Sequence, residues 1–162
     1  MIAHNYQLFG IGIDSANRMQ HLLHALVRER DRNPELFWQL VGDVYSSCDA
    51  TWCYRSWLLD EFRSAPARPT IDKPLQWPLK IYRGCSKDRV RGISWTTSRE
   101  VALRFAAGHR CIPVWKPVVA EAVVHRDAVF LAIDDRSEHE VLVDPRRLRQ
   151  LEVQRVADEV RR

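Results

Sequence analysis

The sequence predicts an α+β protein with a helical part at residues 1–63 and a β-rich part at residues 79–162. Apolar residues recur every three or four positions in the first part, which is the period of a helix buried on one face. Short runs of apolar and β-branched residues replace that pattern after Pro78. Four of the eight prolines lie between them, at 64–78. Dense proline prevents helix and favours an extended connector between the two parts. With 162 residues, we expect one domain, or one domain with a helical extension.

Three helices are expected in the first part. The first begins at Asp14 or Ser15, the second has Asn33 as its N-cap and Pro34 at its first position, and Asp49 caps the third. The side chains expected to face the core are Met19, Leu22, Leu23, Leu26 and Val27 in the first helix, Leu36, Phe37, Leu40, Val41, Val44 and Tyr45 in the second, and Cys53, Tyr54, Trp57, Leu58 and Phe62 in the third.

Six short strands and one helix are expected in the second part. Gly84 should end the first strand, and Ser98 should cap a helix at 99–107 that Gly108 stops. The two prolines at 109–117 indicate a loop. The expected strands cover residues 79–83, 93–97, 118–125, 128–133, 140–143 and 151–156.

Composition argues against membrane insertion, export and metal binding. There is no run of about 18 apolar residues and no basic, then apolar, N-terminal leader, so we expect a cytoplasmic protein without a membrane partner. The cysteines show no Cys-X-X-Cys spacing and are expected to be reduced, although disulfides stay open. His21 and His24 share a helix face, but without a third ligand nearby they are expected to be solvated or at the edge of the core. The cysteines are Cys48, Cys53, Cys85 and Cys111.

The net charge is +4, and arginine supplies nearly all of the positive charge. A guanidinium group matches phosphate oxygens, so this composition suits anionic partners, including nucleic acid. The alternative interpretation is that the arginines are simply solvated.

A pair of glutamates stands before the last apolar run, in Glu138-His139-Glu140. If Glu140 opens a strand, the side chains of Glu138 and Glu140 project from the same face, and His139 projects from the other. Two carboxylates in one space repel each other unless something cationic meets them. An exposed strand edge is the alternative.

Two further motifs supply complementary chemistry. Tyr82-Arg83-Gly84 ends a predicted strand, and a cluster of hydroxyls at 94–98 (Ser-Trp-Thr-Thr-Ser) runs from a strand into a helix. An arginine can bind a phosphate, a hydroxyl can orient a carboxylate, and a carboxylate can stabilise an electron-poor centre.

These three motifs, in this order, resemble the Arg-Ser-Glu class of mono-ADP-ribosyltransferases over about residues 79–156. Arg83 matches the arginine of that class, and Thr96-Thr97-Ser98 matches its Ser-Thr-Ser, since Phe105-Ala106 follows at the usual distance. Glu138-His139-Glu140 matches the Glu-X-Glu motif. The resemblance implies a two-sheet ADP-ribosyltransferase core after the helices, with NAD as co-substrate and no metal.

The resemblance also implies a role for each residue. Glu140 would stabilise the ribosyl cation, and Thr96 would orient Glu140, or Ser94 would do so in a shifted register. Glu138 would favour an arginine acceptor. Arg83 would bind an NAD phosphate and brace the site, and the Gly84 backbone would pair with the nicotinamide amide. The other residues expected near NAD are Tyr82, Ser94, Trp95, Thr97, Ser98 and Arg110, of which Tyr82 and Trp95 could equally belong to the core.

The expected activity is transfer of ADP-ribose from NAD to a macromolecule, with protein arginine favoured and nucleic acid as another acceptor. Such an enzyme would suit a toxin, a phage host-modifier or a defence effector, with an antitoxin or regulatory protein as a conceivable partner. Two alternatives stay open. One is an NAD glycohydrolase of the same fold, and the other is a non-catalytic basic domain that binds nucleic acid or protein.

Overall fold

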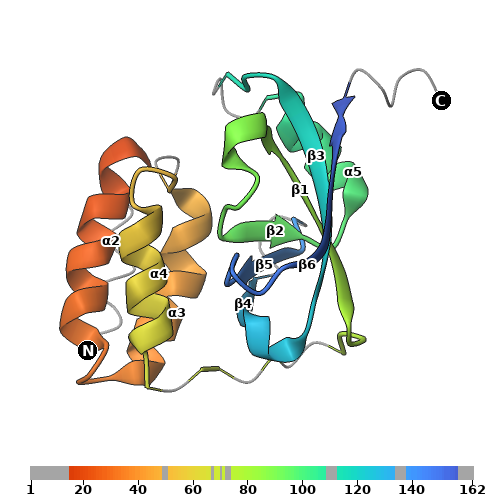
Figure 1. The fold of residues 1–162 in the computed structure, drawn as a ribbon. Helices are drawn as coiled ribbons and strands as arrows, with labels where there is room; N and C mark the ends of the chain where they lie inside the picture. Colours follow the sequence, from red (N-terminus) through yellow and green to blue (C-terminus); the bar gives the residue numbers. More distant parts are fainter. Residues whose placement is uncertain are drawn as a thin grey trace. The chain divides into compact units, whose positions relative to one another are not determined.

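The computed structural model describes residues 15–48, 51–66, 68–69, 71, 74–108, 113–133 and 138–156. The chain divides into two compact units, Met1–Thr70 and Ile71–Arg162 (Figure 1). The boundary falls within the predicted proline-rich connector. Among the described residues there are four α-helices and one antiparallel sheet of six strands, which confirms the predicted α+β class.

The first unit contains α2 (Ser15–Glu29), α3 (Pro34–Val44) and α4 (Arg55–Ser64), with a short 3-10 turn η2 (Tyr45–Ser47) after α3. The side chain of Asn33 accepts a hydrogen bond from the Leu36 N–H at 3.1 Å, so the predicted cap of α3 is confirmed. The ring of Phe62 on α4 lies near aromatic rings of α3 and η2, which closes the core of this unit. Those rings belong to Phe37, Trp38 and Tyr45.

The third helix differs from the prediction. It begins at Arg55 with Tyr54 at the N-cap, while Asp49 lies outside the described residues. Cys53 therefore precedes the helix in a turn and is exposed. Trp57 is 48% exposed, because the buried face of α4 passes through Leu58, Leu59 and Phe62 instead. The predicted core position of Val27 on α2 is also wrong, since that side chain is 45% exposed at the margin of the apolar stripe.

The second unit is built on the sheet, whose strand order is β4-β5-β2-β1-β3-β6. Every neighbouring pair is antiparallel. Two 3-10 turns, η3 (Lys87–Arg89) and η4 (Arg126–Ala128), connect strands. The strands are β1 (Leu79–Ser86), β2 (Ser94–Thr96), β3 (Pro117–Val124), β4 (Val129–Ile133), β5 (Glu140–Val143) and β6 (Arg149–Arg155).

The described strands form one continuous sheet, where the resemblance led us to expect two. Strand β2 is only three residues long, yet it pairs with β5 on one side and β1 on the other. Its register with β1 consists of the single pair Tyr82 and Thr96. The sheet therefore has two halves, β4-β5-β2 and β1-β3-β6, joined at a narrow junction.

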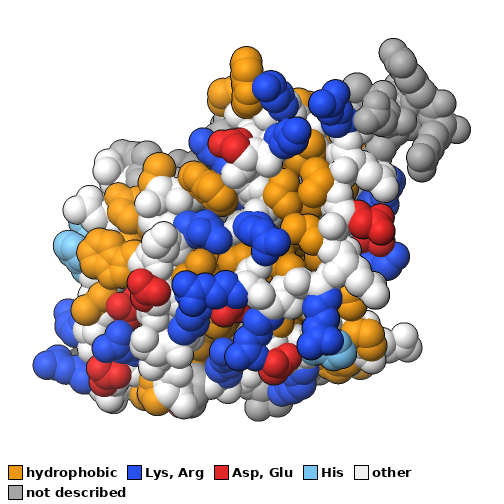
Figure 2. All heavy atoms as spheres, viewed as in Figure 1, with side chains coloured by type: hydrophobic (Ala, Val, Ile, Leu, Met, Phe, Trp, Pro, Cys, Tyr) orange, Lys and Arg blue, Asp and Glu red, His pale blue; other side chains and the backbone are white. Residues whose placement is uncertain are grey.

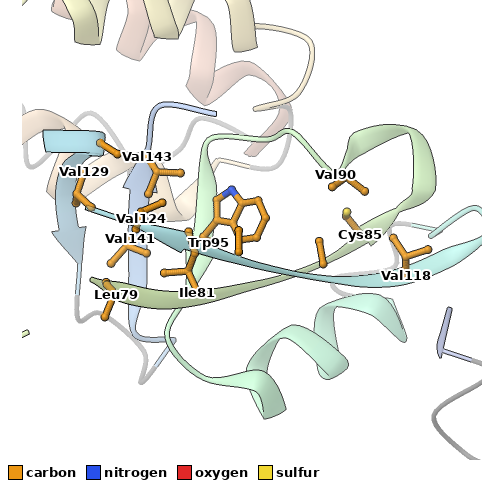
Figure 3. Close-up of a cluster of buried hydrophobic side chains, with 13 residues drawn as sticks. Leu79, Ile81, Cys85, Val90, Trp95, Val118, Val124, Val129, Val141 and Val143 are labelled. Carbon is orange, nitrogen blue, oxygen red and sulfur yellow. The ribbon is translucent and has the colours of Figure 1, made fainter. Parts of the chain in front are cut away.

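The two faces of the sheet are covered differently. Figure 3 shows the larger apolar cluster on one face, with Trp95 among valine and isoleucine side chains and α5 (Arg99–Ala106) on the other side of the strands. Helix α5 packs very closely on β1, since a Cβ added to Gly84 would lie 1.7 Å from the carbonyl oxygen of Ala102. The prediction that Gly84 ends this strand is wrong. Gly84 lies inside β1, and its lack of a side chain allows the close approach of α5.

Candidate functional site

Glu140 occupies the first position of β5 and is 8% exposed. The hydroxyl of Ser94, the first residue of β2, donates a hydrogen bond of 2.5 Å to Oε1 of Glu140. In the register, Thr96 lies opposite Glu140 and Ser94 lies opposite Leu142, so Ser94 and Glu140 are diagonal neighbours on one face. This diagonal places a neutral hydroxyl donor against a buried carboxylate.

The prediction that Thr96 orients Glu140 is wrong, and the alternative of Ser94 agrees with the structure. The hydroxyl of Thr96 donates to the backbone carbonyl of Glu138 at 2.6 Å and accepts from the Ser98 N–H at 3.0 Å. Its single proton is thus directed to the backbone rather than to the carboxylate. Thr96 holds the segment that precedes β5, while Ser94 holds the glutamate itself.

The guanidinium of Arg83 holds the backbone of β2, the strand that carries Ser94 and Thr96. Its Nη1 donates to the carbonyl of Ser94, and its Nε donates to the carbonyl of Arg89 at 3.1 Å. Alternation along β1 places Arg83 on the face of the larger apolar cluster, opposite to the face of Glu140. These contacts link Arg83 to Glu140 through Ser94, while its predicted roles of binding an NAD phosphate and bracing the site stay predictions.

Gly92 is a residue that the sequence interpretation missed. A Cβ added at this position would lie 2.4 Å from Cζ of Arg83, so the guanidinium lies directly against the backbone of Gly92. The carbonyl of Gly92 also accepts a hydrogen bond of 3.0 Å from the indole of Trp95. The only sequence signal was a glycine two residues before the hydroxyl cluster, which is too common to single out.

The geometry at Glu138 also differs from the prediction. Strand β5 begins only at Glu140, and His139 has a left-handed backbone with φ of 47°. The alternation of side chains in a strand therefore does not extend back to Glu138, so the argument that both carboxylates share a face fails. The carbonyl of His139 accepts from the Thr97 N–H at 3.1 Å, and Thr96 holds the carbonyl of Glu138. Two hydrogen bonds thus fix this turn to the end of β2.

The remaining predicted residues divide between core, capping and undescribed positions. Trp95 is 2% exposed within the apolar cluster, which agrees with the alternative that it belongs to the core. Tyr82 is half-buried against the cluster that α5 forms on the other face. The Ser98 hydroxyl accepts from the Val101 N–H at 3.3 Å and caps α5. Arg110 lies outside the described residues.

Cys85 lies two positions after Arg83 on the same face of β1. Burial raises the pKa of its thiol, and the positive charge and hydrogen bonding of Arg83 oppose that rise only in part. The thiol is therefore neutral near pH 7 and behaves as a small apolar side chain of the core. No group of three or more His, Cys, Asp or Glu side chains within the described ranges is arranged to hold a metal ion.

Comparisons with protein-family models, curated proteins and solved structures found no match to this chain. None of the helices described here has both the length and the apolar character needed to cross a membrane.

Proposed function

We propose that this protein is a mono-ADP-ribosyltransferase that cleaves NAD and transfers ADP-ribose to a macromolecular acceptor. One observation carries the proposal: Arg83 holds Ser94, and Ser94 holds a buried Glu140, on three neighbouring strands. These are the three residue types of the Arg-Ser-Glu motif, and hydrogen bonds connect them in that order.

The carboxylate of Glu140 suits the chemistry of NAD cleavage. When the bond between ribose and nicotinamide breaks, the ribose gains positive charge, as a sugar does during glycoside hydrolysis. A buried carboxylate stabilises such charge more strongly than a solvated one. The bond from Ser94 Oγ fixes the direction of this carboxylate without neutralising its charge.

The division of the sheet into two halves supports the proposal of a two-sheet core. We infer an ADP-ribosyltransferase-like core in which β4-β5-β2 and β1-β3-β6 correspond to the two expected sheets. The single registered pair between β1 and β2 marks their junction, and Arg83 and Ser94 lie beside it.

Protein arginine is the favoured acceptor, because Glu138 occupies the position that accompanies arginine transfer in the resembled class. In this proposal Glu138 orients the acceptor guanidinium and takes its proton as the new bond to ribose forms. The two hydrogen bonds at the 138–139 turn would keep this carboxylate in place. Nucleic acid is the alternative acceptor, in keeping with the net charge of +4.

The test is incubation of the full chain with labelled NAD and a cell extract, in parallel with Glu140→Gln. Aliquots are treated with protease or nuclease before the label is counted. We expect label in macromolecules that depends on Glu140 and disappears after protease treatment.

Other outcomes separate the alternatives. Label removed by nuclease would identify a nucleic-acid acceptor. Release of nicotinamide without any labelled macromolecule would indicate an NAD glycohydrolase. A Glu140→Gln variant as active as wild type would contradict the proposed site, and absence of both products would favour a non-catalytic binding domain.

A further inference from the structure

The end of the sheet where β1 finishes and β3 begins presents an exposed tryptophan. Trp115 is 72% exposed, the highest value among the large apolar side chains that the structure describes. Its backbone is nevertheless fixed at both polar groups. The N–H donates to Ser86 Oγ at 2.9 Å, and the carbonyl accepts from the Lys87 N–H at 3.3 Å. A large ring on an anchored backbone loses little conformational freedom when it binds a ligand.

Basic side chains gather at the same end of the sheet. Ser86 pairs with Pro117, and Val118 pairs with Arg155, so the register brings Lys87, Lys116 and Arg155 to this end. All three side chains are exposed, and within the described ranges none of them forms an ion pair. Asp88 is the acidic residue of the adjoining turn η3. Figure 2 shows blue basic and orange apolar side chains together at this end of the sheet.

The ammonium of Lys116 lies 5.7 Å from the centroid of the Trp115 ring, so a cation and an aromatic face are presented together. A partner that suits both must carry negative charge and flat rings at short intervals. Single-stranded nucleic acid has this chemistry, because its phosphates pair with cations and its unpaired bases stack on aromatic side chains.

We propose that Trp115, Lys87, Lys116 and Arg155 form a binding surface for single-stranded nucleic acid. This stacking surface is separate from the Glu140 site, and its occupation requires no catalysis. An acidic polypeptide would satisfy the cations, but it would gain little from the exposed indole. A duplex would also pair with the cations, but its bases are already stacked within the double helix and would not stack on Trp115.

The test is fluorescence anisotropy of a labelled 12-nucleotide single strand, DNA or RNA, with the full chain and no NAD, over a series of salt concentrations. Trp115→Ala should weaken binding by roughly tenfold, because one stacked base is lost. Trp115→Phe should retain most of the affinity. Trp57→Ala is the matched control, since Trp57 is also exposed but lies on α4, and it should leave binding unchanged.

The contribution of charge to binding is tested with two matched variants on β6. Arg155→Gln should reduce the slope of log affinity against log salt by about 0.7, the contribution of one phosphate contact in a single strand. Arg149→Gln removes the same charge from the other end of the same strand and should change the slope much less. Circular dichroism of each variant checks that the fold is intact.

Four outcomes would overturn the proposal. These are absence of binding at low salt, equal affinity of wild type and Trp115→Ala, equal salt slopes for Arg155→Gln and Arg149→Gln, and binding of duplex or poly-glutamate as tightly as the single strand. Because the assay contains no NAD, its failure is distinguishable from failure of the proposed transferase activity.

Discussion

Among the residues that the structure describes, each unit buries one glutamate, and the two accept hydrogen bonds from different kinds of donor. Glu61 on α4 is 7% exposed and pairs with the guanidinium of Arg30 at 3.1 Å. Glu140 on β5 is 8% exposed and receives a hydrogen bond from a neutral hydroxyl. Pairing with a cation offsets the cost of burying a carboxylate, whereas a hydroxyl orients the group and leaves its charge in place. Under the proposed function, similar burial serves stability in one unit and chemistry in the other.

The strongest test of this difference is Glu140→Gln. The amide retains an oxygen to accept from Ser94 but loses the negative charge, so we expect transferase activity to fall by at least about a hundredfold. The thermal unfolding curve should change little, because the shape and the hydrogen bond persist. Retention of most of the activity with labelled NAD would show that the two buried glutamates do not differ in this way.

Removal of the orienting hydroxyl should have the next largest effect. Ser94→Ala should lower kcat by roughly tenfold to a hundredfold, because Glu140 loses the donor that fixes its direction. KM for NAD should change less than kcat, which a purely structural defect would not produce. Ser94→Thr keeps the hydroxyl and should recover part of the rate, so equal losses in both variants would argue against a positioning role.

Glu138 provides a finer test, since it lies in the turn before β5. Glu138→Gln should reduce transfer to a protein arginine about tenfold more than it reduces NAD hydrolysis, because only transfer needs a base at the acceptor. The two rates are measured from the same reaction, as labelled protein and as free nicotinamide. An equal reduction of both would place Glu138 on the NAD side of the reaction.

The corresponding change in the helical unit should affect stability and leave activity alone. Glu61→Gln removes the charge that Arg30 faces, and the free energy of unfolding should fall by about 1–2 kcal/mol. Arg30 also pairs with Asp31 and is 26% exposed, which limits the loss. Denaturant titration measures the change, with Asp43→Asn, an exposed position on α3, as the matched control. A loss of transferase activity at full stability would contradict the contrast between the units.

The smallest expected effect is at His139. A non-glycine residue with φ of 47° costs on the order of 1 kcal/mol, so His139→Gly should raise the free energy of unfolding by less than about 1 kcal/mol. Greater freedom at this turn should also loosen Glu138 and slow transfer slightly. Denaturant titration measures the change in the free energy of unfolding. A decrease in stability would show that contacts of the imidazole outweigh the backbone strain.

The helical unit was predicted well because its determinants are local. Asn33 and Pro34 specify the start of α3 through the chemistry of two adjacent residues, and the stripe on α2 follows from a period of 3.6. Errors occurred where no cap was available, as at the start of α4, and at the margin of a stripe, as at Val27. The strands were also located closely, since β-branched runs bounded by glycine and proline are a local signal.

The sequence by itself determined the α+β class, the order of the elements, and the candidate residues Arg83, Ser94, Thr96 and Glu140. Only the tertiary structure decided which hydroxyl holds which glutamate, that Arg83 acts through a backbone carbonyl, and that the strands form one sheet. The reason is that strand register is a non-local quantity. Shifting the pairing of β2 and β5 by one residue would exchange every side-chain partner across them.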